Sequence, residues 1–512
     1  MLSRSIKEAI KVATAVAVSI ALALFFQWDK PYWAAVTVIA ISANESFGHG
    51  IRQGKMRLLG TLMGVLYALV MIALFSQERL MFIAFFHLFL GFCVFFSDNK
   101  RYGYAFTMAF TVFAIVAMMG GTNGTASFDV AILRIQETLL GVLVYSGVFR
   151  FLWPTTTESL FFDTLETLTQ QFALARTRLT QALSDGQTLD GDAELLANQG
   201  NVDRLRELLA LSAASHYQLR HEKDKWQSVV QACDGIQGHI TQLTEAIASQ
   251  QRQQRQPHEA NHQQPDLEQP SLAQTALAET DQAETSLDET GLIRQGLDKL
   301  NLELDLLAAS IDKEKPQSRE LARYWAGQSQ SNAELNAQVE ANANAKAANK
   351  AAQSKLLQQR LTNALTAIAI SLTCFSLWIY FAIPGGPIFP LIGAALANVA
   401  VHMPGSIIRQ AKLACLAWGA LFLAEYCFIL TTLTELWQLV AFYGINTLLV
   451  YGYFNKPSQV VIRLLGGNLL LIMTMNALHS TPQYEIITPL LMLVIMLICL
   501  TVVRFYLRLF KE

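Results

Sequence analysis

The chain has 512 residues, of which 52% are hydrophobic and 15% are charged, and its mean hydropathy is +0.31. Folded soluble domains carry about a quarter of their residues as charged side chains, so this composition excludes a purely soluble protein and predicts an integral membrane protein, with the lipid bilayer as a partner. The formal net charge of −2 conceals an uneven distribution, because the part of the chain outside the membrane segments is acidic; it has no basic stripe for nucleic acid, which we do not expect among the partners.

The first part of the chain contains six apolar segments that approach the length needed to cross about 30 Å of hydrocarbon. They lie near residues 11–27, 31–44, 57–76, 80–97, 102–120 and 129–152. The first resembles a secretory signal, but further spans follow it directly, so we interpret it as an uncleaved helix. These segments predict a six-helix membrane bundle over residues 1–154.

An acidic insert over residues 155–360 follows. It holds 29 of the 40 acidic and 19 of the 38 basic residues, which gives it a net charge of −10 and leaves +8 for the rest. Apolar residues at helical spacing predict helices over 158–184, 193–250, 292–314 and 318–360. The Gln-, Glu- and Pro-rich stretch near 251–290 predicts a disordered linker. The simplest interpretation is a helical assembly that packs on itself or on a second subunit, so a homo-oligomer is an open alternative.

Six more apolar segments complete the chain and predict a second six-helix bundle over residues 361–512. They lie near residues 361–382, 386–402, 409–430, 435–452, 459–478 and 485–508. The predicted fold is therefore all-α: a polytopic membrane protein of about twelve transmembrane helices with a helical insert.

The basic residues give the orientation. With the N-terminus in the cytoplasm, 16 Lys and Arg residues fall in or near the inner loops, whereas only Lys30 and Arg79 fall in the outer ones. This asymmetry predicts that both termini and the insert are cytoplasmic.

The two membrane halves also repeat each other. Ile51-Arg52-Gln53-Gly54-Lys55 recurs as Ile408-Arg409-Gln410-Ala411-Lys412. Each half begins inside and has an even number of spans, so we expect parallel repeats related by an axis along the membrane normal. The seam between the repeats is the natural place for a pathway.

Neither enzymatic nor cofactor-binding patterns are found. The sequence lacks a GxxxxGK[ST] phosphate loop and has no HExxH, GxSxG or GxGxxG in a workable context. Its six cysteines show no CxxC or Cys/His ligand spacing. We therefore predict that the protein is not an enzyme and needs no metal or cofactor.

Ionisable groups within membrane spans are costly and are candidates for function. Arg134 and Glu137 are three residues apart on the sixth span, so they can form a salt bridge that locks two helices or a charged pair facing the pathway. His87 and Glu425 are candidates for proton coupling. For His87 the simpler alternative is a hydrogen bond to a backbone carbonyl.

The basic loops are candidates for attracting substrate. Seven residues would ring the inner mouth of the seam if the repeats pack as expected: His49, Arg52, Lys55, Arg57, His402, Arg409 and Lys412. Such a vestibule would concentrate anions, although part of this signal is simply the cytoplasmic bias of basic residues. Aromatic residues such as Trp33 and Trp378 suit a flat organic anion, although aromatic residues in membrane proteins more commonly serve as interfacial or packing residues. Gly60 and Gly64 predict close packing of the third helix against a neighbour.

Several of these stretches look like one known family. Tyr32-Trp33-Ala34-Ala35-Val36-Thr37-Val38, together with Arg57 to Gly64, resembles the signature of the fusaric acid resistance and aromatic acid exporter family, and Arg134, Glu137 and Trp153-Pro154 resemble its sixth span. The resemblance implies a bacterial inner-membrane protein with two six-helix bundles, linked to efflux of aromatic carboxylates. It also implies, for some relatives, a periplasmic adaptor and an outer-membrane channel.

The sequence thus predicts a secondary exporter of small organic anions, driven by the membrane potential or by proton exchange. A passive organic-anion channel and a non-transporting membrane scaffold remain as alternatives.

Overall fold

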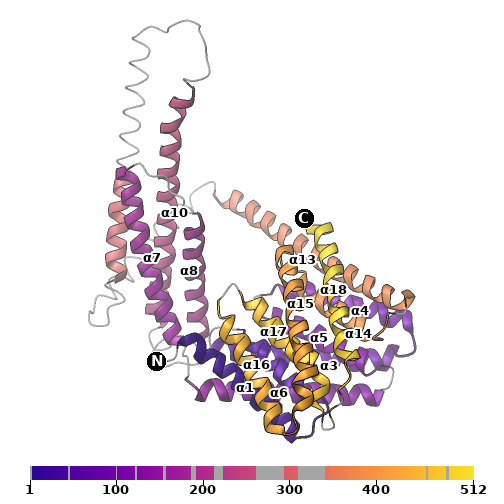
Figure 1. The fold of residues 1–512 in the computed structure, drawn as a ribbon. Helices are drawn as coiled ribbons and strands as arrows, with labels where there is room; N and C mark the ends of the chain where they lie inside the picture. The colour runs from indigo at the N-terminus through magenta and orange to yellow at the C-terminus, as the bar shows by residue number, and fades with distance from the viewer. Residues whose placement is uncertain are drawn as a thin grey trace, which may run out of the picture. The chain divides into compact units, whose positions relative to one another are not determined.

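The computed structural model describes residues 3–43, 47–99, 101–121, 124–153, 157–185, 192–212, 223–260, 293–308, 341–381, 383–456, 459–479, 482 and 484–511. Within these ranges every regular element is a helix (Figure 1). The chain divides into two compact units, one formed by Met1–Thr155 and Ala345–Glu512 and the other by Thr156–Asn344. The prediction of an all-helical polytopic protein is confirmed.

The membrane unit is built from two sets of six α-helices, one set on each side of the insert. The first set is α1 (Arg4–Phe25), α2 (Tyr32–Ile41), α3 (Phe47–Phe75), α4 (Arg79–Ser97), α5 (Gly103–Met119) and α6 (Gly124–Phe151). The second set is α13 (Ala341–Phe381), α14 (Ile388–Ala400), α15 (Gly405–Phe428), α16 (Leu436–Tyr453), α17 (Val460–Met473) and α18 (Ile487–Lys511). Short 3₁₀ turns follow α15 at Leu430–Thr432 and α17 at Met475–Leu478.

Each predicted span contains or overlaps one of these helices, but the starts differ. The third span was expected to begin at 57, whereas α3 begins at Phe47. Arg52 and Lys55 therefore lie on a helix and not in a loop. Hydropathy misses this first part of α3 because its charged side chains interrupt the apolar run, although they do not prevent helix formation.

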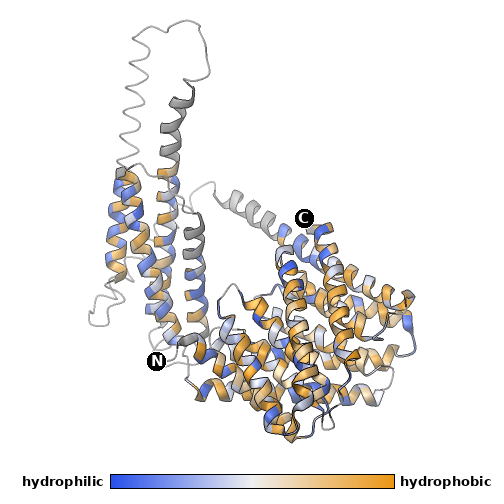
Figure 2. Ribbon diagram, in the orientation of Figure 1, coloured by the Kyte–Doolittle hydropathy of each residue, from blue (hydrophilic) through white to orange (hydrophobic). Residues whose placement is uncertain are grey.

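Among the described residues, the helices long and apolar enough to cross a membrane are α1, α3, α4, α13, α15 and α18. Helices α2, α5, α14 and α17 are apolar but shorter, and most residues of α2 are buried within the unit. Orange, hydrophobic residues dominate the helices of this unit (Figure 2). The chain is thus a multi-pass membrane protein in which short apolar helices are packed among long ones.

The two halves pack in the same pattern. Helix α3 packs against α5 and α6, and the equivalent α15 packs against α17 and α18; likewise α2 packs against α6, and α14 against α18. The contacts between the halves are partly reciprocal. Helix α2 packs against α17 and α14 against α5. Helix α1 packs closely against α16, whereas the equivalent helices α13 and α4 meet mainly through side chains, with the Phe86 and Phe375 rings 5.0 Å apart. Such reciprocity is the mark of a twofold relation and agrees with parallel repeats.

The halves share one continuous hydrophobic core instead of forming two separate bundles. Ile39 of α2 packs beside Gly467 of α17, and both helices contribute fully buried residues to this core. Between α13 and α14 the chain reverses through Gly385 and Gly386, whose φ angles of 104° and 58° favour glycine.

Gly60 and Gly64 lie where α3 meets α5. A Cβ atom on Gly60 would collide with the carbonyl oxygen of Ala105, and one on Gly64 with that of Ala109. The two backbones therefore approach more closely than side chains would allow, as in other small-residue contacts between membrane helices. The sequence predicted a close neighbour for α3 without identifying it, and the structure shows that this neighbour is α5.

The insert forms its own compact unit from α7 (Thr157–Asp185), α8 (Asp192–Ser212), α10 (Lys223–Ala260) and a helix over 293–308. A separate apolar core joins these helices, with Phe161, Phe172 and Cys233 among its fully buried residues. The linker predicted over 251–290 needs correction, because α10 continues through 251–260. Residues 261–290, and the predicted helical residues 309–314 and 318–340, lie outside the described residues.

Candidate functional site

A cavity of about 520 Å³ lies at the ends of α3, α5 and α13, beside the start of α4. Walls from both halves enclose it, since α13 belongs to the second half and the other three helices to the first. It lies at the opposite end of α3 from Arg52 and Lys55. The volume falls within the range of sites that hold small organic molecules.

The lining of this cavity is mostly apolar and partly aromatic. Ile72, Phe82, Phe375, Trp378 and Ile379 line it, and the Phe375 and Trp378 rings meet edge to face with their centroids 6.2 Å apart. Trp378 is one of the aromatic residues that the sequence suggested as a lining. A flat ring would find apolar contact on several sides here.

Polar groups stand at one edge of the cavity. Ser76 and Gln77 follow the end of α3, and Arg79 begins α4. Arg79 carries a permanent positive charge on an exposed side chain. An apolar chamber with a guanidinium at its edge can accommodate a molecule that has an aromatic body and a carboxylate, because the two parts then meet complementary surfaces.

The predicted basic residues lie at the other end of α3 and on α15. Arg52 and His49 are half-buried, Lys55 and Arg409 are exposed, and the Lys412 ammonium donates to the Thr501 hydroxyl of α18 at 2.9 Å. Helices α3 and α15 pack mainly with helices of their own halves. The ring around one shared mouth therefore stays a prediction.

Arg57 lies deeper than the other basic residues of α3. Its guanidinium donates to the Tyr104 hydroxyl at 3.0 Å and to the Thr37 hydroxyl at 3.3 Å. Arg57 thus connects α3 with α2 and α5, so its side chain is already committed to neighbours within the first half.

Arg134 and Glu137 form a buried ion pair on α6, with Arg134 Nη1 and Glu137 Oε2 3.4 Å apart. The guanidinium also lies over the Trp33 ring of α2, 3.6 Å from its centroid. Within the described part of the chain, Arg134 Nε and Nη2 have no hydrogen-bond partner. Of the two sequence alternatives, this geometry favours a pair that locks α2 to α6.

The two candidates for proton coupling occupy different surroundings. His87 is buried with Nδ1 2.7 Å from the Ile83 carbonyl oxygen, and its ring meets that of Phe375 edge to face at 4.9 Å. Because Ile83 and Phe375 line the cavity, His87 stands directly behind its wall. Glu425 is half-buried on α15 and interacts with the Asn446 side chain of α16.

Among the described residues, no group of three or more His, Cys, Asp or Glu side chains is placed to hold a metal ion.

Comparison with known families decides the identity of this architecture. The family model described as fusaric acid resistance protein family matches residues 6–510, nearly the whole chain. The chain belongs to the fusaric acid resistance protein family.

Individual relatives in this family are distant. A protein named uncharacterized transporter YdhK from Escherichia coli (strain K12) is 26% identical over 44% of this chain and 33% of its own length. Proteins named p-hydroxybenzoic acid efflux pump subunit AaeB are similar as well. The protein from Enterobacter cloacae is 26% identical over 28% of this chain and 23% of its own length. The protein from Edwardsiella ictaluri is 25% identical over 41% of this chain and 34% of its own length. The chain thus matches about a quarter to a third of the length of these curated relatives.

Sequence reasoning missed several groups that the structure brings together. Lys11, at the start of the first predicted span, counts in the sequence only as one of the 16 basic residues in or near the inner loops, yet it is fully buried on α1, 2.8 Å from Glu8 and over the Phe149 ring. Arg79 was counted only as an outer basic residue. The Phe149 contact of Lys11 and the cavity beside Arg79 depend on helices far apart in the chain, so no periodicity marks either site. A basic residue within the first turns of an apolar helix was the available signal for Lys11.

Proposed function

We propose that this chain exports small aromatic carboxylates across a bacterial inner membrane. Membership of the fusaric acid resistance protein family supports this, as do relatives named for efflux of p-hydroxybenzoic acid. The observation that carries the proposal is the cavity between the two halves, with Phe82, Phe375 and Trp378 in its wall and Arg79 at its edge. Its chemistry matches an aromatic ring that bears one negative charge.

The membrane potential is sufficient as a driving force. Moving one negative charge out of a cell with a negative interior gains about 2.3 kcal/mol per 100 mV, which equals a concentration ratio of roughly fifty. Export of a monovalent carboxylate then requires no nucleotide hydrolysis. The proposal places the termini and the insert in the cytoplasm, so that the basic residues of α3 and α15 meet substrate first and the cavity meets it last.

A partner protein belongs to the same proposal. The relatives from Enterobacter cloacae and Edwardsiella ictaluri are named as pump subunits. We infer that this chain also delivers its substrate to a periplasmic adaptor and an outer-membrane channel.

The test is transport by the purified full chain in liposomes. Radiolabelled p-hydroxybenzoate is offered outside, and a potassium gradient with valinomycin imposes an interior-positive potential. We expect saturable accumulation that disappears without the potential. Accumulation of p-hydroxybenzamide, which has the same ring but no charge, is expected to stay at the level of protein-free liposomes.

Matched variants connect the flux to the cavity. Arg79→Gln is expected to raise the KM for p-hydroxybenzoate about tenfold, the ratio that corresponds to loss of about 1.4 kcal/mol. Arg150→Gln removes another exposed arginine, at the end of α6, and should leave transport unchanged. If the wild type carries no aromatic carboxylate under either sign of potential, the proposed function is wrong. Flux that follows voltage without saturating would favour the passive channel.

A further inference from the structure

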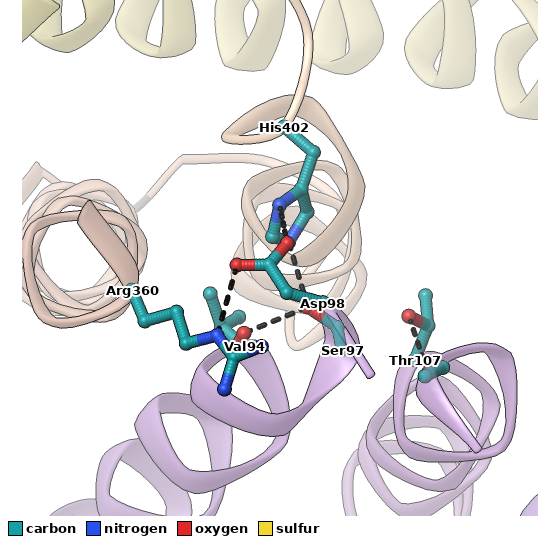
Figure 3. Close-up of polar contacts among 7 residues, drawn as sticks. Val94, Ser97, Asp98, Thr107, Arg360 and His402 are labelled. Carbon is teal, nitrogen blue, oxygen red and sulfur yellow. Dashed lines mark hydrogen bonds and ion pairs between the residues drawn. The ribbon is translucent and has the colours of Figure 1, made fainter. Parts of the chain in front are cut away.

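Polar side chains from both halves meet at the end of α4 (Figure 3). Asp98 caps α4, and its Oδ1 atom lies 3.2 Å from His402 Nδ1, in the turn between α14 and α15. Its other oxygen lies 3.7 Å from Arg360 Nε on α13. The Ser97 hydroxyl lies 2.8 Å from His402 Nε2. The imidazole thus lies between two oxygen-bearing side chains of the opposite half.

The contacts of this imidazole favour its protonated form. Ser97 Oγ donates its one hydrogen to the Val94 carbonyl at 2.7 Å, so toward His402 it can only accept. The Asp98 carboxylate is also an acceptor. With the Ser97 hydroxyl directed to Val94, the imidazolium form satisfies both contacts, because it presents a hydrogen to Ser97 and a positive charge to the Asp98 carboxylate. A neutral ring satisfies both neighbours only as the Nδ1–H tautomer with the Ser97 hydroxyl turned away from Val94 toward Nε2.

Charges around His402 act in opposite directions. Asp98 favours the protonated ring, whereas Arg360, which approaches the same carboxylate from α13, opposes it. Arg101, three residues after Asp98, lies over the Tyr102 ring. The His402 and Asp98 side chains are 27% and 33% exposed, so water can deliver and remove the proton.

The cluster occupies only one of the two equivalent interfaces. Asn99-Lys100 of the first half recurs as Asn455-Lys456 in the second, so the counterpart of Asp98 is Phe454. Phe454 is not ionisable and packs edge to face on Trp418. A proton can therefore change the contact of α4 with the second half without changing its counterpart at α16.

We propose that His402 is a proton-binding residue whose charged form ties the end of α4 to the turn before α15. When the pH rises and His402 loses its proton, its ion pair with Asp98 is lost and this contact between the two halves opens. This extends the proposed export function, since it supplies a proton site at the end of the unit that faces away from the cavity.

Hydrogen exchange measures directly how often the contact between the end of α4 and the turn before α15 opens. Hydrogen exchange of the full chain in nanodiscs is followed by mass spectrometry between pH 5.5 and pH 8, with the intrinsic pH dependence of exchange removed. We expect peptides covering 97–104 and 400–408 to exchange about tenfold faster at pH 8, a ratio that corresponds to about 1.4 kcal/mol. His402→Gln and Asp98→Asn should abolish this difference.

Controls separate protonation from misfolding. His479→Gln changes a histidine at the other end of the unit, before α18, and should keep the full pH response. Unfolding temperatures at pH 8 should be the same for His402→Gln and the wild type, because the neutral ring contributes little there. An unchanged pH response in His402→Gln, or no response in the wild type, overturns the proposal. Since this readout needs no substrate, a failure of transport alone would leave it standing.

Discussion

The guanidinium of Arg134 on α6 lies 3.6 Å from the centre of the Trp33 ring on α2. A cation over an indole face is attracted by the ring electrons, and the attraction is stronger where water is excluded. Arg134 is 4% exposed, so this contact joins α2 to α6 in such surroundings.

Trp33→Leu removes the ring face and should lower the free energy of unfolding by about 2 kcal/mol, measured by chemical or thermal unfolding in detergent. Trp33→Phe should lower it less, because a smaller ring face remains. The control is Trp437→Leu on α16, where the side chain is exposed. Equal losses for Trp33→Leu and Trp437→Leu would mean that the contact contributes nothing.

Glu137→Gln leaves the Arg134 charge buried without its counter-ion. Removing one partner of a buried ion pair costs about 3–5 kcal/mol, and we expect a loss of this size in the same unfolding assay. Replacing both residues, by Arg134→Met with Glu137→Met, should recover much of that loss. A double variant as unstable as Glu137→Gln would contradict the assignment of these two groups as a mutually dependent pair.

Gly64→Ala tests the close approach of α3 and α5. The added methyl group would collide with the Ala109 carbonyl oxygen, so one backbone must move. We expect a loss of about 1–3 kcal/mol and a lower yield of folded protein on size-exclusion chromatography. Gly147→Ala on α6 places the same methyl group in open space and should be neutral or slightly stabilising.

Cys233 provides a pH-dependent test of the insert core. Burial raises the pKa of its thiol to about 12, and only the thiolate reacts with alkylating reagents. Iodoacetamide at pH 8 should therefore leave Cys233 unmodified in the folded protein and modify it after urea unfolding, as read by peptide mass spectrometry.

The raised pKa of Cys233 also predicts how the free energy of unfolding of the insert changes with pH. The unfolded thiol ionises near pH 9, well below the folded one, so the contribution of Cys233 is complete below about pH 9 and is lost as the pH rises toward 12. Cys233→Ser should weaken this alkaline loss. Rapid alkylation of the native protein at pH 8 would show that the insert core is open.

The sequence predicted the helices well and their partners poorly. Apolar run length sets where a chain can cross a bilayer, so the spans were visible one by one. The start of α3 was missed because Arg52 and Lys55 lower the local hydropathy. The pairing of Trp33 with Arg134, and of Asp98 with His402, depends on how helices far apart in the chain pack. One sequence contains no local signal for that.

The internal repeat made one long-range feature predictable from the sequence, namely that the two halves meet through equivalent surfaces. Two like halves must meet through equivalent surfaces, and the structure has this reciprocity in part of its helix contacts. The repeat could not indicate that a cavity opens beside α4 and α13, because side-chain volumes at that point differ between the halves.

The closeness of α3 and α5 limits how the cavity can change shape. With no layer of side chains at Gly60 and Gly64, the backbones of α3 and α5 are in direct contact, and we expect these two helices to move together. Ile72 of α3 and Met118 of α5 line the cavity and would move with them. We therefore expect the cavity to change size around a bound molecule mainly by movement of α4 and α13, which form the rest of its wall.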